Sequence, residues 1–336
     1  MKKSRNYLNY GRVFLKICIW LLIFSPCPSF SASNSFVPPA GKTLLLIGQD
    51  RDTIARYVRS TGNVPGGAML YTNIQKSEGL DRPADYGAGP IDGDALLRSY
   101  PNSVIQLGLY MVDGLNNTLD GTYDASLMRL ARWIKKADRP VYLRIGYEFD
   151  LPSNHYDPEK YKNVFRYVVD FLRKEGVRNA AYVWHSYCAP YSDKEWMDWY
   201  PGDDYVDWFG VSMFSTSQIP IASNFLKLAR EHGKPFMICE STPQGLYSIR
   251  GKIEWLRHMF QFIKDRNVGA FCYIDTDWDK QKMWVGQSWG DARLEKNAET
   301  KSLWLKEIAQ ERYLKASPGL FHSLGWVKSK REEKGR

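Results

Sequence analysis

The stretch Val141-Tyr-Leu-Arg-Ile-Gly-Tyr-Glu-Phe149 decides the fold of this chain. It is an apolar run that leads into a carboxylate, Glu148. A second run of the same kind, Pro235-Phe-Met-Ile-Cys-Glu240, ends in another glutamate. Continuous apolar runs of this length are typical of buried parallel strands, whose carboxyl ends build the mouth of a barrel. The sequence therefore predicts that the two glutamates lie at the same end of one sheet.

Eight such runs alternate with longer amphipathic segments. The expected strands are Thr43–Gly48, Ala68–Thr72, Val104–Val112, Val141–Phe149, Ala180–Ser186, Val206–Phe214, Pro235–Glu240 and Ala270–Asp275. The expected helices are Asp52–Arg59, Tyr123–Ala137, Pro158–Glu175, Ile221–His232, Ile249–Arg266 and Asn297–Arg312. A strand-to-strand interval of about 25 to 40 residues fits one βα unit, and eight units predict an α/β protein with a single-domain (β/α)8 TIM barrel. A doubly wound open sheet is the alternative, but the first turn, residues 48–52, is not rich in glycine.

The amino terminus, residues 1–31, is expected to be a secretory signal peptide. It begins with five cations and no acidic residue: Lys2, Lys3, Arg5, Arg12 and Lys16. The apolar run Ile17–Phe24 and then small residues follow, in the order that signal peptides have. The run is shorter than the roughly 20 apolar residues of a membrane span. We therefore expect a secreted or periplasmic protein with no stable membrane insertion after cleavage, with an uncleaved anchor as the alternative.

The charge distribution argues against nucleic acid as a partner. The formal net charge of the chain is +9, and loss of the five amino-terminal cations leaves about +4. Much of the remainder lies in the expected basic tail, residues 316–336, so the body has no basic face for nucleic acid. Residues 32–41 are expected to be a linker and residues 42–315 the catalytic domain of a monomer.

The cysteines and histidines do not suggest a metal or a disulfide framework. Three cysteines remain after removal of the signal peptide: Cys188, Cys239 and Cys272. An odd number at wide spacing favours small buried side chains, although a Cys239–Cys272 disulfide stays open. The sequence has no Cys-x-x-Cys and no His-Glu-x-x-His motif, so we expect neither a metal site nor a cofactor.

Side-chain alternation places further residues beside Glu148. Arg144 is expected on the same face of its strand as Glu148, and Tyr147 on the other face unless the strand has ended. An Arg144–Glu148 ion pair that only braces the barrel is one interpretation. Where both glutamates form a shared site, we expect Arg144 to contact Glu240.

Glu240 is expected on the same face as Phe236 and Ile238. A structural interpretation is that its carboxylate caps the following turn. Because Glu148 and Glu240 both end strands at one end of the barrel, a shared site is favoured over two structural roles. A pair of carboxylates in this position predicts hydrolysis of a glycosidic bond.

Aromatic residues follow several strands, and they suggest a sugar ligand. Aromatic rings stack on the apolar faces of sugars, so Trp184, Trp278 and Trp284 are expected to bind substrate. His185 is expected to orient a carboxylate or a sugar hydroxyl. Core packing of the tryptophans and a structural role for the histidine are the alternatives.

Three segments resemble glycoside hydrolase family 26: Arg144-Ile-Gly-Tyr-Glu-Phe149, Trp199-Tyr-Pro-Gly-Asp-Asp-Tyr-Val-Asp-Trp-Phe-Gly-Val211 and Lys234-Pro-Phe-Met-Ile-Cys-Glu240. The resemblance covers residues 41–312. It implies a retaining (β/α)8 glycosidase, and the family contains endo-acting β-mannanases with some xylanases and β-glucanases. It also implies that Glu148 is the acid/base, Glu240 the nucleophile and Trp278 the platform under the cleaved sugar.

The chain departs from the family pattern at three positions that are expected to contact substrate. Tyr147 stands where the family usually has histidine, and Ser212 and Phe214 stand where it usually has aspartate and tyrosine. Phenylalanine cannot make the hydrogen bond that the tyrosine would make to the nucleophile. These departures leave the catalytic pair intact and indicate a divergent branch.

The sequence thus predicts a secreted retaining glycoside hydrolase that cleaves a β-linked polysaccharide, β-mannan or a related β-glycan. A non-catalytic carbohydrate-binding barrel of the same fold is the first alternative. A serine hydrolase on an α/β sheet is the second, and for it we expect no Gly-x-Ser-x-Gly elbow.

Overall fold

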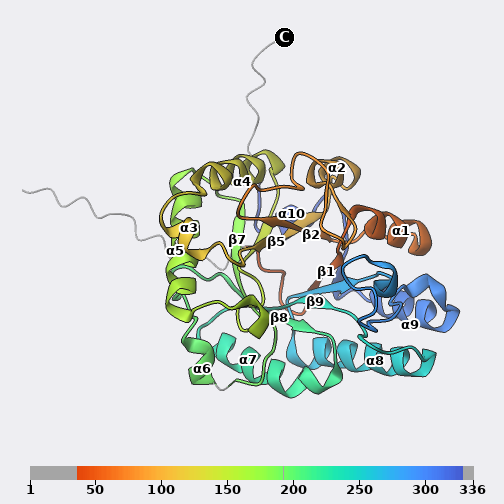
Figure 1. Ribbon diagram of the computed structural model, residues 1–336. Helices are drawn as coiled ribbons and strands as arrows, with labels where there is room; N and C mark the ends of the chain where they lie inside the picture. The colour runs from red at the N-terminus through yellow and green to blue at the C-terminus, as the bar shows by residue number, and fades with distance from the viewer. Residues whose placement is uncertain (1–35, 192, 328–336) are drawn as a thin grey trace, which may run out of the picture. The chain divides into compact units, whose positions relative to one another are not determined.

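Eight parallel strands form a closed barrel with helices around it (Figure 1). The computed structural model describes residues 36–191 and 193–327. The barrel strands are β1 (Thr43–Gly48), β2 (Gly67–Asn73), β5 (Val104–Tyr110), β6 (Val141–Ile145), β7 (Ala180–Ser186), β8 (Trp208–Met213), β9 (Phe236–Ser241) and β10 (Ala270–Ile274). Each strand pairs with the next, and β10 pairs with β1 to close the ring. The prediction of a (β/α)8 TIM barrel is confirmed.

Helices fill the connections between the strands. They are α1 (Arg51–Thr61), α2 (Gly93–Ser99), α3 (Leu115–Leu119), α4 (Asp124–Ala137), α5 (Pro158–Lys174), α6 (Asp193–Met197), α7 (Ile219–Glu231), α8 (Ile249–Arg266), α9 (Ala298–Ile308) and α10 (Leu320–Ser323). The six helices expected from the sequence are all present. Polar side chains start several of them, as when Asp157 accepts a hydrogen bond from the backbone N–H of Lys160 at the start of α5.

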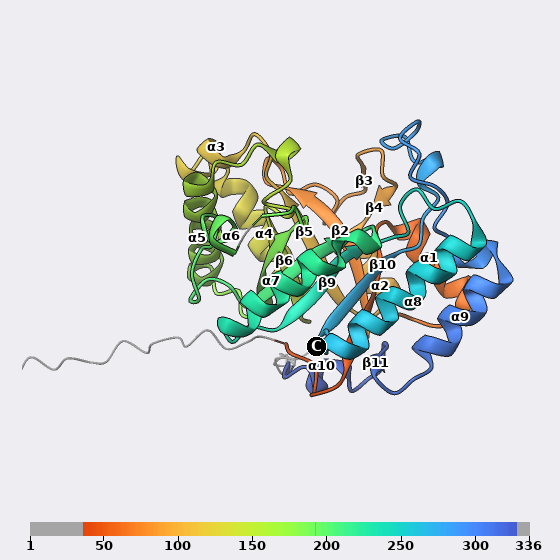
Figure 2. The same ribbon diagram turned by 90° about the horizontal axis from the view of Figure 1, so that it is seen from below.

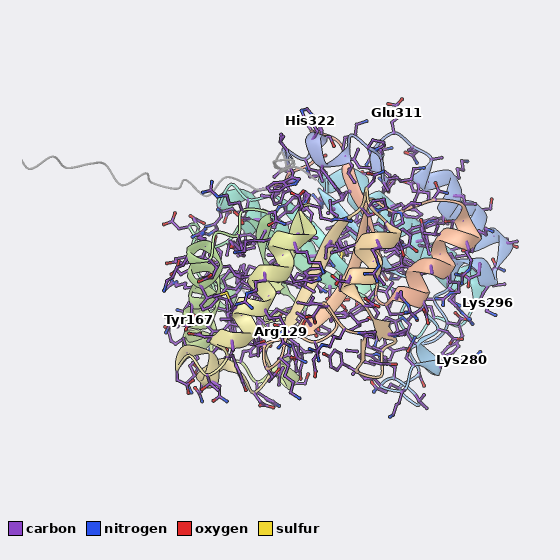
Figure 3. All side chains as sticks on the ribbon, turned by 90° about the horizontal axis from the view of Figure 1, so that it is seen from above. Arg129, Tyr167, Lys280, Lys296, Glu311 and His322 are labelled. Atoms are coloured by element: carbon purple, nitrogen blue, oxygen red, sulfur yellow. The ribbon has the colours of Figure 1, made fainter. Side chains whose placement is uncertain are left out.

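Small elements complete the chain. An antiparallel hairpin, β3 (Ala84–Asp85) and β4 (Pro90–Ile91), follows β2, and the short strand β11 (Tyr313–Leu314) pairs with β1. Figure 2 shows the β3–β4 hairpin and the loops after β10 at one end of the barrel, with β11 and α10 at the other. Figure 3 gives the same two ends by residue, with Lys280 at one and Glu311 and His322 at the other.

The segments expected to be a linker and a tail both contribute to the packed body. Phe36 is buried, and its carbonyl accepts a hydrogen bond of 2.6 Å from the hydroxyl of Tyr142. The Phe36 ring packs edge-on against Trp326, with the ring centroids 5.9 Å apart. In α10, Leu320 and Phe321 are also buried. Within the expected tail, apolar residues at helical spacing thus pack α10 onto the barrel, and residues 328–336 lie outside the described residues.

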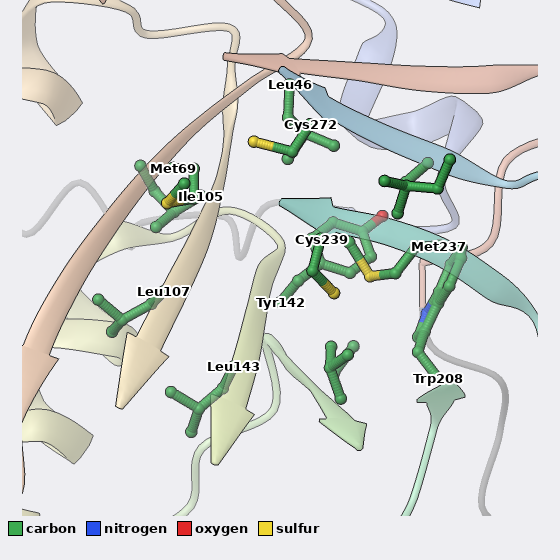
Figure 4. Packing of buried hydrophobic residues seen from close by; sticks show 14 of the residues in the cluster. Leu46, Met69, Ile105, Leu107, Tyr142, Leu143, Trp208, Met237, Cys239 and Cys272 are labelled. Carbon is green, nitrogen blue, oxygen red and sulfur yellow. The ribbon is translucent and has the colours of Figure 1, made fainter. Parts of the chain in front are cut away.

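Large side chains fill the barrel interior near the amino-terminal ends of the strands. The Tyr142 and Trp208 rings meet edge-on at 5.5 Å, and Figure 4 shows them together with Met237 and Cys239 between the strands. A barrel of eight strands is just wide enough for side chains to fill. The packed interior leaves the carboxyl ends of the strands as the place for polar groups.

The predicted signal peptide lies outside the described residues. Within residues 36–191 and 193–327, no helix has the length and apolar character needed to cross a bilayer. All three cysteines in this range are free, so the Cys239–Cys272 disulfide is absent.

Replacement of Gly210 by alanine is expected to destabilise the barrel. A Cβ there would collide with the Sγ atom of Cys239 and lie 3.0 Å from the Val183 side chain. Overpacking of this kind lowers the free energy of unfolding by about 1–3 kcal/mol. Denaturant unfolding of Gly210→Ala measures the loss. Gly319→Ala is the matched control, because its Cβ would meet no atom within 4 Å; equal stabilities of the two variants would contradict this packing.

Candidate active site

A β-bulge turns Glu240 into the barrel. Val211 of β8 pairs with Ile238 of β9, but the next residue, Ser212, pairs with Glu240, so Cys239 is one extra residue in β9. Cys239 faces Gly210 inside the barrel, and the bulge puts Glu240 on this same inner side. The expectation that Glu240 shares a face with Ile238 is therefore wrong, because alternation is interrupted at the bulge.

Polar contacts inside the barrel stabilise the bulge. The side-chain amide of Gln106 donates a hydrogen bond of 2.8 Å to the carbonyl oxygen of Cys239. This bond satisfies a buried backbone acceptor at the extra residue. Glu240 itself is only 6% exposed, so its carboxylate lies in a site that is mostly shielded from water.

A tight turn presents Glu148. Strand β6 ends at Ile145, earlier than expected, because Gly146 and Glu148 both have positive φ, 54° and 53°. A left-handed conformation is uncommon for a residue other than glycine and is often found at functional sites. The side-chain amide of Asn154 holds the turn by donating to the carbonyls of Tyr147 and Glu148, at 3.2 and 2.9 Å.

The turn also brings Tyr147 to the site. Since the strand has already ended, Tyr147 is on the same side as the glutamates. Its ring lies 5.1 Å from the guanidinium carbon of Arg144 and stacks on the His185 ring at 6.4 Å. Tyr71, at the end of β2, covers Arg144 from another side at 5.2 Å. These aromatic faces attract the cation and exclude water from it.

Arg144 is the floor of the site. Its side chain is fully buried, and Nη1 forms an ion pair with Oε1 of Glu240. The ion pair is thus with Glu240, as expected for a shared site, and not the Arg144–Glu148 pair of the structural interpretation. Burial alone would lower the pKa of Arg144, but the carboxylate of Glu240 raises that pKa above its ordinary value. The guanidinium therefore stays charged and serves as the counter-ion of the Glu240 carboxylate.

Glu148 is connected to the same network through two polar side chains. Nη1 of Arg144 lies 3.3 Å from Nδ1 of His185, and Nε2 of His185 lies 3.0 Å from Oγ of Ser212. The Ser212 hydroxyl donates a hydrogen bond of 2.6 Å to Oε1 of Glu148. Because Ser212 is the strand partner of Glu240, the two carboxylates lie on adjacent positions of one polar cluster.

The two glutamates differ in their electrostatic surroundings. Burial, and then the negative charge of Glu240, raises the pKa of Glu148 to about 8. Burial and the charge of Arg144 keep the pKa of His185 well below its ordinary value. A buried acid that holds a proton beside a carboxylate paired with arginine is the arrangement in which one group can donate a proton and the other can attack.

Tryptophans form a wall next to Glu240. Trp278 is buried, and its indole N–H donates a hydrogen bond of 3.0 Å to Thr242, two residues after Glu240. The rings of Trp284 and Trp289 lie 5.4 and 4.9 Å from that of Trp278. Trp284 is half-buried, as is Trp289, so this wall combines core packing with partly accessible ring surface.

Of the two other aromatic residues expected to bind substrate, Phe214 lies at the site and Trp184 does not. Phe214 follows β8 and packs edge-on against Trp289 at 5.2 Å, so it extends the aromatic wall. Trp184 points out of the barrel, opposite to its neighbour His185, and is fully buried. Its ring stacks on Phe149 at 4.5 Å. The structure therefore does not bring Trp184 to the glutamates, in agreement with the core-packing alternative for this residue.

Sequence reasoning missed two residues of the site. Tyr71 could have been found as an aromatic residue at the carboxyl end of the second barrel strand. Asp150 is buried and accepts hydrogen bonds of 2.6 Å from both the Ser186 hydroxyl and the Tyr187 N–H. It ties the Glu148 turn to the segment after β7. The sequence feature that could have pointed to Asp150 is its position as an acidic residue two places after Glu148.

The expectation that the chain has no Gly-x-Ser-x-Gly sequence is wrong. Gly286-Gln-Ser288-Trp-Gly290 does fit the Gly-x-Ser-x-Gly pattern. Ser288 is exposed in an irregular segment between two short 3-10 helices, Trp278–Lys280 and Leu294–Lys296. A nucleophile elbow requires a turn between a strand and a helix, so this match is not one. Among the described residues, no cluster of three or more histidine, cysteine or acidic side chains could hold a metal ion.

Two hollows flank the β3–β4 hairpin. One, of about 580 Å³, lies between the hairpin and α4, and the other, of about 690 Å³, lies between the hairpin and residues 280–283. Neither is lined by Glu148 or Glu240. The buried polar cluster, rather than the size of a hollow, therefore defines the candidate site.

Comparison with known proteins identifies the family. The profile of glycosyl hydrolase family 26 matches residues 145–311. The β-1,3-xylanase TXYA of a Vibrio species is 34% identical over 327 residues, which cover 88% of this chain and 71% of that protein. The chain belongs to glycosyl hydrolase family 26. This family member is therefore a glycoside hydrolase.

Further relatives agree with this assignment. A β-1,3-xylanase of an Alcaligenes species is 32% identical over 334 residues, covering 89% of this chain and 71% of that protein. The β-mannanase BoMan26A of Bacteroides ovatus superposes with a TM-score of 0.64 at 17% identity, over 84% of this chain and 93% of that one. An endo-β-1,4-mannanase of Cellulomonas fimi gives a TM-score of 0.61 at 17% identity, over 84% and 74%. At these identities the two structures show the common fold alone.

NMR titration of the glutamate carboxyl groups is expected to find Glu148 with a pKa of about 8. Glu240→Gln removes the neighbouring negative charge, so the pKa of Glu148 should fall in that variant. It should remain above the ordinary value because burial is the larger cause. Glu311→Gln, an exposed change at the opposite end of the barrel, is the control. An unchanged Glu148 pKa in Glu240→Gln would mean that the two carboxyls are not coupled.

Proposed function

We propose that this family 26 hydrolase cleaves β-1,3-linked xylan with retention of anomeric configuration. The observation that carries the mechanism is the buried pair of glutamates, one in an ion pair with Arg144 and the other hydrogen-bonded to Ser212. Two β-1,3-xylanases at 34% and 32% identity support the substrate. The mannanases resemble the chain in fold only, at 17% identity.

The three departures from the usual family pattern support xylan over mannan. Tyr147 is packed against Arg144 and His185, Ser212 is bonded to Glu148, and Phe214 joins the tryptophan wall. Each therefore makes contacts of its own in place of those made by the usual residue. Packing that differs at three positions around the same pair of glutamates fits a site shaped for a different sugar.

In the first step, the Glu240 carboxylate attacks the anomeric carbon. The bond from that carbon to the glycosidic oxygen breaks as Glu148 gives its proton to the leaving oxygen. Arg144 holds the Glu240 carboxylate in place through their ion pair. The tryptophan wall, led by Trp278, supplies the apolar surface for the sugar ring.

In the second step, water releases the sugar. Once Glu240 is an ester, its charge is gone, and the pKa of Glu148 falls because that charge was one cause of the raised value. Ionised Glu148 then takes a proton from water, the water oxygen bonds to the anomeric carbon, and the bond to Glu240 breaks. The same residue is thus acid first and base second.

A reducing-sugar assay across a panel of polysaccharides tests the substrate. We expect the highest kcat/KM on β-1,3-xylan and at least about tenfold less on β-1,4-mannan, the size of discrimination that a few changed contacts supply. Cellulose and β-1,3-glucan extend the panel. Preference for mannan would overturn the substrate, and binding without turnover on every member would favour the non-catalytic barrel.

Variants of the two glutamates test the mechanism. Glu240→Ala should abolish turnover on every substrate. Glu148→Ala should lower kcat on polysaccharide by about 10²–10⁴-fold, the usual contribution of general acid–base catalysis, and should spare the first step on aryl glycosides with good leaving groups. Glu311→Ala is the control. Near-normal rates for folded Glu240→Ala, or an inverted first-formed anomer by NMR, would contradict the assignment.

We also propose that the protein is exported. The support is the basic, apolar and small order of residues 1–31, which lie outside the described residues. Mass spectrometry of protein from the culture medium or the periplasm should find a new amino terminus within about residues 29–35. Recovery of the intact Met1 form from membranes would instead indicate an anchored enzyme.

A further inference from the structure

A continuous set of hydrogen bonds runs from the floor of the site to Glu148. Its members come from three adjacent strands: Arg144 of β6, His185 of β7 and Ser212 of β8. All three side chains are completely buried. The distances are 3.3 Å from Arg144 to His185, 3.0 Å from His185 to Ser212 and 2.6 Å from Ser212 to Glu148.

The direction of these bonds follows from the chemistry of the groups. A guanidinium only donates hydrogen bonds, so Nδ1 of His185 must accept from Arg144. His185 is neutral, because burial and the charge of Arg144 lower its pKa. Its single proton is therefore on Nε2, which donates to Oγ of Ser212. The one proton of Ser212 is left for Oε1 of Glu148.

We propose that His185 and Ser212 are positioning residues that assign the catalytic proton of Glu148 to a single oxygen. Oε1 accepts the Ser212 hydrogen bond, so Oε2 carries the proton to the leaving oxygen and later receives one from water. This proposal rests on the proposed function of Glu148 as the acid/base. It extends that function, because it names the oxygen that faces the sugar and the two residues that select it.

The arrangement has a consequence for both glutamates. The same nitrogen, Nη1 of Arg144, contacts Glu240 and His185. The orientation of the nucleophile and that of the acid/base are therefore set from one buried point. The hydroxyl of Ser212 can donate to Glu148 in either of its protonation states, so the carboxyl need not rotate between the two steps.

Other charged and titratable groups also influence the pKa of Glu148. A variant that tests the Ser212 hydrogen bond must leave these groups unchanged. They are Glu240, Arg144, Asp150, Tyr147, Tyr156, Tyr187, Cys188 and Cys239. Replacement of Ser212 leaves every one of these groups in place. A change in the titration of Glu148 after that replacement then reports the lost hydrogen bond.

Ser212→Ala is the decisive variant, with Ser212→Thr to restore the hydroxyl. The hydrogen bond stabilises ionised Glu148, so its loss should raise the pKa of Glu148 and the alkaline limb of kcat/KM by about one to two pH units. On polysaccharide, kcat should fall about tenfold to hundredfold with little change in KM, because Ser212 acts behind Glu148. The first step on an activated aryl glycoside should change little.

Ser103→Ala is the matched control. Ser103 is a buried serine directly before β5. Its hydroxyl donates a hydrogen bond of 2.7 Å to the carbonyl of Pro65 rather than to a carboxylate. It loses the same group from the opposite end of a barrel strand. We expect its pH profile and its Glu148 titration to match those of the unmodified protein.

A second measurement does not depend on any variant. Nitrogen NMR of the unmodified protein should show His185 as a neutral ring with its proton on Nε2. A proton on Nδ1, or a Glu148 titration that is the same in Ser212→Ala as in the unmodified protein, overturns the proposal.

Failure of the proposed function has a different signature. It would appear as turnover that survives Glu240→Ala, or as no turnover by the unmodified protein on any glycan. Failure of the present inference alone leaves turnover dependent on Glu148 and Glu240 but unaffected by Ser212→Ala.

Discussion

A positive charge sealed inside the barrel is the constraint on which the site depends. Arg144 has no exposed surface, and an unpaired ion in such a place would be strongly destabilising. Glu240 supplies the counter-charge, and two tyrosine rings cover the planar group. The next polar group along the network, His185, must then be neutral and must present a lone pair. The chemistry of the surrounding residues thus follows from one buried guanidinium.

Two departures from regular strand geometry aim the glutamates. Glu240 faces inward because β9 has an extra residue at Cys239, and Glu148 faces inward because its backbone is left-handed after β6. Both irregularities occur at the carboxyl end of the barrel, where the hydrogen-bonded ladder is finishing and a local change disturbs the fewest bonds. The regular part of the barrel supplies the rigid support, and the irregular part supplies the geometry of the site.

The sequence predicted the repeating architecture well, because strand and helix periodicities are local. The ends of β1, β7 and α8 agree with the structure to the residue. Prediction from the sequence failed where contacts with other parts of the chain decide the local backbone geometry. The bulge at Cys239 depends on register with β8, and the early end of β6 depends on a turn held by Asn154. Neither leaves a periodic signal.

The candidate site shows the same division. Glu148 and Glu240 were evident from their places at strand ends, and the contact of Arg144 with Glu240 was expected. The bond from Ser212 to Glu148 joins residues 64 positions apart, so no local pattern could reveal it. Trp184 was expected at the sugar because it is an aromatic residue near the end of its strand, but it faces the side opposite to its neighbour His185.

The packing of Phe36 against Trp326 brings the first and last parts of the folded body together at the end of the barrel away from the glutamates. A covalent link made on the described chain beside Phe36 or Trp326 would therefore lie on the face that points away from a polysaccharide chain. The enzyme could be fixed to a solid support by that link with its working face directed outward.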